Sequence, residues 1–374
     1  MTSTATPVPD DAPAPEAEPL VDWSAAAEVA GRLAHPGPTA DRADLAALVD
    51  GLRTAAGTAV DHVLAVTRME PAAGGVAADG TPDLGDVLVV DRRTWTRANV
   101  GSMRSLTAPI AEALGPDAPT VSSAARLGGA VEVGTVLALL STKVLGQFDP
   151  YGDARGRLLL VAPNVLAAER SLGVRPADFR LWVCLHEQTH ALQFATAPWL
   201  ADHLRGRLGE LLQDVTRSSM GMARAPLHEK LAFVGRAVVR VLRGDGRSPL
   251  DGVLGPDQRR ELEEITAVMA LLEGHADVMM DAVGPRVVRS VATIRAKFER
   301  RRQGEGAPPL DLFLRRLLGM DAKLAQYRDG ARFVRAVEEQ VGRDGLNAVW
   351  AEAANLPTAR EIADARAWVR RVHG

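Results

Sequence analysis

Apolar side chains recur at intervals of three and four residues along most of this chain, which is the spacing of one buried face of an α-helix. The repeat predicts helices over residues 21–34, 41–69, 93–115, 121–146, 176–196, 199–221, 226–243, 257–283, 286–302, 309–319, 321–342 and 358–372. Two short, almost uninterrupted apolar runs instead predict strands at 86–92 and 156–164. We therefore expect a helix-dominated α+β fold with a minor, short-stranded sheet.

The predicted helix 176–196 is apolar around almost its whole circumference, so we expect it to be buried. Pro176 suits the first turn of this helix, where its missing N–H is not needed. The centre of the helix, VCLHEQTHALQF, nevertheless carries His186, Glu187 and His190. Burying one unpartnered polar group costs about 2–7 kcal/mol, so three ionisable groups in this place require a specific partner.

The rest of the chain divides into a tail and one domain. Residues 1–20 are rich in proline, alanine and acidic side chains, which predicts a disordered tail. We expect residues 21–374 to form a single domain, with an N-terminal helical part over about 21–150 and a catalytic and C-terminal helical part over about 151–374. We expect no signal peptide and no membrane span, because no window reaches the roughly 18 uninterrupted apolar residues that a span needs.

Composition and charge narrow the classes of function. Hydrophobic residues make up 47% and charged residues 24% of the chain, as in ordinary globular proteins. The net charge of −3 does not favour binding to nucleic acid or to an anionic membrane. The single cysteine, Cys184, cannot form an internal disulfide, which fits a reducing, cytoplasmic location. We interpret the basic stretch 286–302 as a solvated helix face.

His186 and His190 are four residues apart, so their rings leave one face of the predicted helix and can converge. With Glu187 they form H-E-x-x-H, in which two imidazoles bind Zn²⁺ and the glutamate acts as a general base toward water. The alternative is a pair of core histidines satisfied by hydrogen bonds, with Glu187 in a salt bridge. We favour the zinc site, because a buried carboxylate beside two imidazoles is costly without a cation.

A catalytic zinc site needs a third protein ligand and one open position. The G-x-x-H continuation of the metzincins is missing after His190. The downstream stretch LLEGHADVMMD places Glu273 and Asp277 four residues apart, which resembles the arrangement of the gluzincins. That resemblance implies Glu273 as the third ligand and Asp277 as the acceptor of an imidazole N–H, which we expect to belong to His186. His275 and Asp277 remain alternatives for the third ligand, and His275 cannot share an ion with Glu273 because it lies about 200° around the helix.

Hydrolysis of an amide also needs a hydrogen-bond donor for the oxyanion that develops during attack. Tyr327, one of only two tyrosines, lies on a late predicted helix that could cover the cleft. The alternative is an amphipathic core tyrosine. His228 and His275 are further candidates for the donor. Cys184 lies two residues before His186 and points to a different face, so we expect it to fill the core.

Several blocks of the sequence resemble a known family. They are similar to an actinobacterial family of zinc-dependent, zincin-like metallopeptidases, some of whose members are associated with biosynthesis of a deazaflavin coenzyme. The blocks are STKVLGQFDPYG, LLLVAPNV, CLHEQTHALQF, LLEGHADVMMDAVG, LLGMDAKLAQYRDGARFV and NLPTAREIADARAWV. The resemblance spans about residues 20–372 and implies a largely helical zincin-like fold with a zinc ion as cofactor.

The same resemblance places the zinc motif on His186, Glu187 and His190, with Glu273 as the third ligand. The separation of 83 residues between His190 and Glu273 (273 − 190) requires the intervening helices to fold back.

We therefore expect a zinc-dependent metallopeptidase-like hydrolase that acts on a peptide or a small amide. Two alternatives remain: a non-catalytic, metal-stabilised scaffold or binding protein, and a small-molecule amidase or esterase linked to cofactor biosynthesis. A scaffold would close the site with a fourth protein ligand, such as His275 or Asp277. An extended peptide would instead add to an unpaired strand edge, for which the predicted strand 156–162 is the candidate.

Overall fold

The computed structural model describes residues 21–72, 76, 82–114, 122–152, 155–224, 255–302 and 320–374. Within these ranges, the side chains of residues 109–114, 215–224, 301–302 and 320–328 are not described. The predicted tail 1–20 and the predicted helices 226–243 and 309–319 lie outside the described residues.

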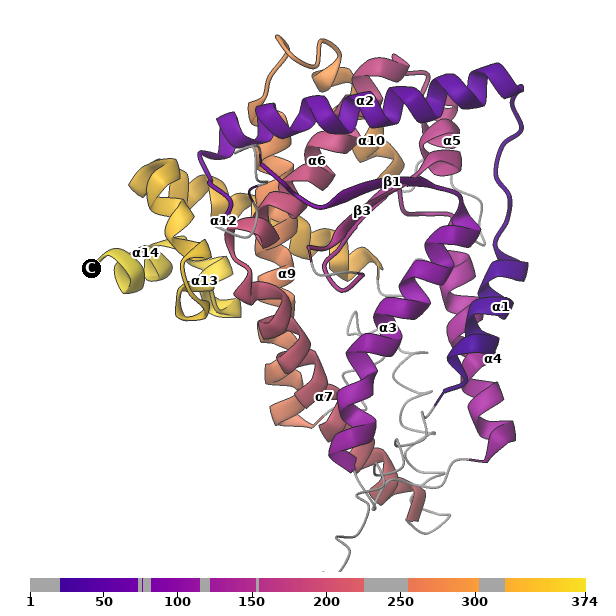
Figure 1. Ribbon diagram of the computed structural model, residues 1–374. Coiled ribbons are helices and arrows are strands. Elements are labelled where there is room, and N and C mark those ends of the chain that lie inside the picture. The colour runs from indigo at the N-terminus through magenta and orange to yellow at the C-terminus, as the bar shows by residue number, and fades with distance from the viewer. Residues whose placement is uncertain are drawn as a thin grey trace, which may run out of the picture.

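Helices form most of the described structure (Figure 1). They are α1 (Trp23–Leu33), α2 (Arg42–Thr67), α3 (Arg92–Leu114), α4 (Ser123–Leu140), α5 (Ala162–Leu172), α6 (Pro176–Thr196), α7 (Trp199–Arg224), α9 (Pro256–Ala282), α10 (Val291–Arg302), α12 (Met320–Leu346), α13 (Ala359–Ala363) and α14 (Ala365–His373). Two short 3-10 helices, η4 (Asn347–Trp350) and η5 (Ala353–Asn355), lie between α12 and α13. The predicted helix-dominated class is confirmed.

The sheet has three strands, β1 (Asp86–Val90), β2 (Gly146–Asp149) and β3 (Arg157–Val161). Their order is β1-β3-β2, with β1 parallel and β2 antiparallel to β3. The two predicted strands are present and shorter than predicted. The expectation that residues 156–162 offer an open edge is wrong, because β3 is the central strand and is hydrogen-bonded on both sides.

The sheet separates two hydrophobic clusters. Successive side chains of a strand point to opposite faces. Leu158 and Leu160 therefore belong to the larger cluster, with residues of α2, α5, α6 and α9, whereas Leu159 and Val161 belong to the smaller cluster, with residues of α1, α3 and α4. Figure 1 shows α2 and α6 on one side of the sheet and α1, α3 and α4 on the other.

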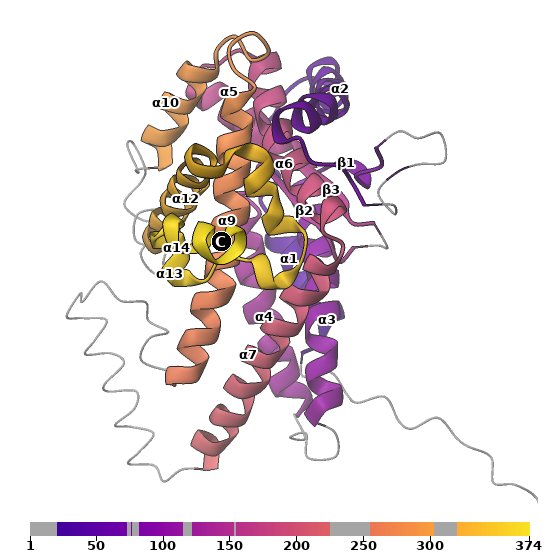
Figure 2. The ribbon, with the colours of Figure 1, turned by 90° about the vertical axis from the view of Figure 1, so that its left-hand side faces the viewer.

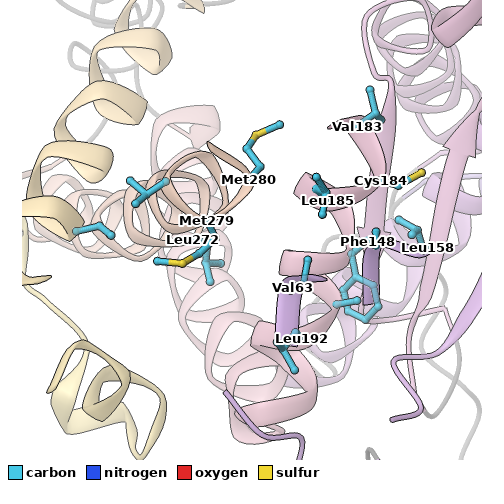
Figure 3. Close-up of a cluster of buried hydrophobic side chains, with 14 of the residues drawn as sticks. Val63, Phe148, Leu158, Val183, Cys184, Leu185, Leu192, Leu272, Met279 and Met280 are labelled. Atoms are coloured by element: carbon cyan, nitrogen blue, oxygen red, sulfur yellow. The ribbon is translucent and has the colours of Figure 1, made fainter. Parts of the chain in front are cut away.

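Helix α6 lies in the middle of the larger cluster. It spans residues Pro176–Thr196, which confirms the predicted range. Figure 3 shows Leu185 and Leu192 of α6 between Met280 of α9 on one side and Phe148 and Leu158 of the sheet on the other. The helix is buried because apolar side chains leave it in several directions, as its sequence predicts.

Helices α9 and α12 cross at very short range, and Figure 2 shows them side by side. A Cβ atom at Gly330 would overlap the carbonyl oxygen of Ala270, and one at Gly274 would overlap the backbone of Gly330. Two glycines at the crossing remove this obstacle and let the backbones touch. The crossing fixes α9 against the C-terminal helices.

Two elements beside the sheet differ from the sequence expectation. The helix predicted over 121–146 ends at Leu140, and strand β2 starts at Gly146, inside that range. Helix α5 starts at Ala162, inside the range predicted as a strand, because Pro163 belongs to the first turn of a helix rather than to the end of a strand.

Two helices near the C-terminus also differ from their predicted ranges. Helix α10 begins at Val291 rather than at residue 286. The helix predicted over 358–372 is divided into α13 and α14 at Asp364, whose side chain accepts a hydrogen bond from the backbone N–H of Ala367 and caps α14.

Within the part of the chain that the structure describes, one helix, α4, is long and apolar enough to cross a membrane by length and composition. Its residues Ala130 and Gly134 are buried, and Gly134 lies directly against Val29 of α1. Leu127 and Val131 are exposed on the same helix. The expectation that the chain has no membrane span remains a prediction.

Candidate metal centre

Helix α6 brings the two histidines of the H-E-x-x-H motif together. The Nε2 atoms of His186 and His190 lie 3.2 Å apart. Their rings are almost perpendicular, with centroids 4.8 Å apart. The two side chains are 16% and 13% exposed, so both remain partly accessible from outside. Two imidazole nitrogens therefore converge on one point beside α6.

Helix α9 brings Glu273 to the same point. Its Oε2 lies 3.4 Å from Nε2 of His186, and its Oε1 lies 3.9 Å from Nε2 of His190. One potential ligand atom of each residue lies within 4.8 Å of the others. Direct packing of α9 against α6 closes the long separation in sequence. The structure thus brings together both histidines and the first of the three candidates for the third ligand.

Asp277, one turn after Glu273, lies beside His186 and also binds an arginine. Its Oδ1 is 3.9 Å from Nδ1 of His186 and 3.3 Å from Nη1 of Arg295 in α10. The first distance exceeds hydrogen-bond range, so Asp277 acts on His186 as a nearby charge rather than as the direct acceptor that we expected. Arg295 also pairs with Asp281 at 2.8 Å. No sequence pattern marks Arg295 for this role, because it lies in the basic stretch 286–302 that we interpreted as a solvated helix face.

His275 lies away from the metal group, although it is only two residues from Glu273. It is fully buried, and its ring packs against Trp350 with a centroid distance of 5.2 Å. Burial, together with the charges of His190 and Arg343, lowers the pKa of His275 to about 3, so the ring is neutral. His275 is therefore not placed to bind the same ion as Glu273.

Gln193 is a site residue that sequence reasoning missed. It follows His190 by three residues on α6, and its Oε1 lies 2.9 Å from Nδ1 of His190. The side chain is fully buried. A metal-binding histidine usually donates its second N–H to an acceptor of this kind. The available signal was the H-x-x-Q spacing, because residues three apart lie on the same face of a helix.

Glu187 differs from the other buried carboxylates of the described chain. The buried aspartates and glutamates are Asp149, Glu169, Asp178, Glu187 and Glu361. An arginine or a serine hydroxyl binds each of the other four. Among the described residues, the Glu187 carboxylate has no hydrogen-bond or ion-pair partner. The alternative in which Glu187 forms a structural salt bridge therefore finds no support in this part of the chain.

Strand β2 forms one wall around Glu187. A Cβ atom at Gly146 would lie 2.6–2.8 Å from Cγ, Cδ and Oε1 of Glu187, so this close approach requires glycine. Burial raises the pKa of Glu187 to about 7, although the neighbouring His186 lowers it and Glu273 raises it further. The carboxyl group can therefore exchange a proton near neutral pH.

The surrounding carboxylates set the protonation of the two histidines when no cation is bound. Burial opposes a charge on His186, but the hydrogen bond to Glu273 and the charges of Glu187, Glu273 and Asp277 raise its pKa to about 9. Burial lowers the pKa of His190. The group thus retains a proton on His186, which means that its environment favours a positive charge at this point. A divalent cation would satisfy the same preference.

The remaining candidates lie outside the group or outside the description. His228 is not among the described residues, and Tyr327 lies in the part of α12 whose side chains are not described. Their role as oxyanion donors stays a prediction. Cys184 is fully buried, and its Sγ lies 3.8 Å from the carbonyl oxygen of Leu52, so it fills the core as predicted.

The chain is similar to known proteins in both structure and sequence. The crystal structure of a protein from Chloroflexus aurantiacus, described as a candidate hydrolase with a novel fold, is similar to this chain, with 28% sequence identity and a TM-score of 0.64. The similarity covers 94% of this chain and 98% of that chain. No curated protein matches the chain. The zincin-like metallopeptidase family matches residues 21–369, and the chain belongs to that family.

Proposed function

We propose that this protein is a zinc-dependent hydrolase that cleaves amide bonds of peptides, with Glu187 as its general base. The observation that carries the proposal is the buried Glu187 carboxylate, which has no hydrogen-bond or ion-pair partner among the described residues and lies beside three convergent residues that could hold a metal ion. A purely structural site would have no use for a buried carboxylate without a hydrogen-bond or ion-pair partner, because its burial opposes folding.

The donor set fits zinc. Two imidazole nitrogens and one carboxylate oxygen, from His186, His190 and Glu273, are the ligands of a known class of catalytic zinc sites. Membership of the zincin-like family implies a metal, typically zinc. A zinc ion held there would act as a Lewis acid and would lower the pKa of a coordinated water to about 7.

Glu187 would move the proton in this reaction. Its pKa of about 7 in the cation-free protein allows the carboxylate to accept a proton from the attacking water and to return it to the leaving amine. Because Gly146 has no side chain, the backbone of β2 lies close to the Glu187 side chain and limits where its carboxyl group can move.

The metal-stabilised scaffold is less well supported than the hydrolase. A structural zinc site is normally closed by four protein ligands. In the described part of the chain, the group of potential ligands contains three residues, and His275 points elsewhere. This arrangement leaves a position for water.

We propose an extended peptide as the substrate rather than a small amide. Strand β2 is an outer strand of the sheet, and it contacts the Glu187 side chain through Gly146. A peptide could add to such an edge as a further strand. A cavity of about 390 Å³ lies between α7, α9 and the segment before α13, but none of the metal-ligand candidates lines it. That cavity therefore gives no support to a small-molecule substrate at the metal group.

The test combines metal analysis with peptide cleavage. We expect about one zinc per chain and cleavage of a peptide library by the purified protein. Glu187→Gln should retain zinc and lose activity by about 10²–10⁴-fold, as for removal of a general base. Glu273→Gln should lose zinc, whereas Glu263→Gln, an exposed change on the same helix, should leave both properties intact. Absence of zinc, or undiminished cleavage by Glu187→Gln, would contradict the proposal.

A further inference from the structure

The side-chain amide of Gln193 connects α6 to α9 through three contacts. Its Oε1 lies 2.9 Å from Nδ1 of His190. Its Nε2 lies 3.0 Å from the backbone carbonyl oxygen of Leu272 and 3.0 Å from Nδ1 of His275. Gln193 and His275 are both fully buried, so the contacts with Leu272 and His275 are shielded from water, whereas the contact with His190 is partly buried.

The Leu272 carbonyl decides which way the amide faces. A carbonyl oxygen only accepts hydrogen bonds, so the atom opposite it must be the amide nitrogen, which donates. Reversing the Gln193 amide would place two acceptor oxygens about 3 Å apart in a buried site, where an unsatisfied polar group costs about 1–3 kcal/mol. The amide oxygen of Gln193 must therefore face His190.

This orientation fixes the positions of the protons on two histidines. The Gln193 oxygen can only accept, so Nδ1 of His190 carries a hydrogen and its Nε2 carries the lone pair. The Gln193 nitrogen donates to Nδ1 of His275, so that ring carries its hydrogen on Nε2. The short contact between the Nε2 atoms of His186 and His190 is consistent with this assignment, because one of the two nitrogens must be an acceptor.

We infer that Gln193 is a positioning residue that holds His190 in the Nδ1–H tautomer, and that the Leu272 carbonyl enforces this state. Leu272 directly precedes Glu273, so the turn of α9 that supplies the third ligand also orients the second one. The link to metal binding rests on the proposed function, but the tautomer itself does not. The two histidines are therefore in opposite tautomers, His190 with hydrogen on Nδ1 and His275 with hydrogen on Nε2.

The direct test is nitrogen NMR of histidine-labelled, metal-free protein near neutral pH, with the two rings assigned by single substitutions. We expect the Nδ1–H signature for His190 and the Nε2–H signature for His275. Observation of His190 as the Nε2–H tautomer in the native protein would overturn the inference. This measurement needs no zinc and no substrate, so it stands or fails independently of the proposed hydrolase.

Variants of Gln193 test its positioning role. Gln193→Leu should abolish the tautomer preference of His190 and weaken zinc binding by about 10–100-fold, measured by competition with a chelator. Gln193→Glu keeps an acceptor oxygen toward His190 and should keep the Nδ1–H tautomer, but it also places an oxygen against the Leu272 carbonyl and should lower the stability of the protein. The matched control is Gln188→Leu, because Gln188 is also buried on α6 and donates to a backbone carbonyl, that of Ala56, without touching a ligand. Equal losses of zinc affinity in Gln193→Leu and Gln188→Leu would refute the role.

Discussion

The first turns and the central turns of helix α6 both bury charged or polar groups, but those groups differ in how they are paired. In the first turns, Asp178 accepts hydrogen bonds from the backbone and hydroxyl of Ser290, and Arg180 pairs with Glu169 through two hydrogen bonds of 2.8 and 3.2 Å. In the central turns, Glu187 has no hydrogen-bond or ion-pair partner among the described residues. One helix thus contains both one-to-one pairs and a buried carboxylate that lacks such a partner.

The contrast separates groups that hold the fold from groups that serve chemistry. A buried ion pair with complete hydrogen bonds anchors neighbouring elements, and the Arg180–Glu169 pair attaches α6 to α5. A buried carboxylate without a partner destabilises the fold and persists where chemistry needs it. Changes in the first turns and in the central turns of α6 should therefore have opposite effects on stability and function.

The largest effect on stability is expected in the first turns of α6. Arg180→Leu leaves the Glu169 carboxylate buried without compensation, because the two side chains are only 16% and 4% exposed. We expect the free energy of unfolding to fall by about 3–5 kcal/mol in urea denaturation. Zinc content of the folded protein should not change. Adding Glu169→Leu should recover part of the lost free energy of unfolding. An Arg180→Leu variant as stable as the native protein would contradict the distinction between the first and the central turns of α6.

A smaller effect is expected where α9 is held in place against α12. Gly330→Ala inserts a methyl group against the Ala270 carbonyl, which should cost about 1–3 kcal/mol and displace Glu273 enough to weaken zinc binding. Gly206→Ala in α7 is the control, because a Cβ atom there meets nothing within 4 Å. That change should stabilise the helix by up to about 1 kcal/mol. Equal thermal shifts of both variants would contradict the prediction.

The third effect concerns Glu187 in the central turns of α6. Substitution of this residue should raise the free energy of unfolding, whereas the two changes above should lower it. Burial raises the pKa of Glu187 to about 7, so its contribution to stability is complete below its unfolded pKa and is lost as the pH rises through about 7. Metal-free Glu187→Gln should therefore be more stable than the native metal-free protein by up to about 3 kcal/mol at pH 8, and by less than about 1 kcal/mol at pH 5. Denaturation at the two pH values measures this difference. A variant that is less stable at pH 8 would assign Glu187 to the fold.

The smallest effect is expected at Cys184, which lies between Arg180 and Glu187 on α6. Burial raises the pKa of this thiol, and the side chain is fully enclosed. We expect no reaction with a disulfide reagent in the native protein and full reaction after unfolding in urea. Rapid modification of the native protein would show that α6 opens at Cys184, and the first turns and the central turns could then not be treated as parts of one rigid helix.

The local parts of the candidate site could be predicted from the sequence. The spacing of His186 and His190 depends only on helix geometry, and the apolar residues around them predicted burial of α6 correctly. Glu273 was inferred from a resemblance, and packing of α9 on α6 places it beside both rings.

The parts that depend on contacts distant in sequence could not be predicted. The orientation of the Gln193 amide is set by the carbonyl group of Leu272, 79 residues away in the sequence, and no local sequence pattern indicates that contact. Strand β2 has only four residues, and its conformation comes from pairing with β3 rather than from its own apolar pattern. Arg295 likewise depends on where α10 docks, so its sequence looked like an ordinary basic surface.

Gly146 gives protein engineering a way to change reactivity without touching a ligand. The space beside the Glu187 carboxyl group is too small for even one methyl group, so the residue at position 146 controls where that carboxyl group can rest. A designer who wanted an inert but metal-loaded scaffold could enlarge this residue and leave His186, His190 and Glu273 intact. The backbone of the short outer strand β2 thus limits the space available to the Glu187 carboxyl group beside it.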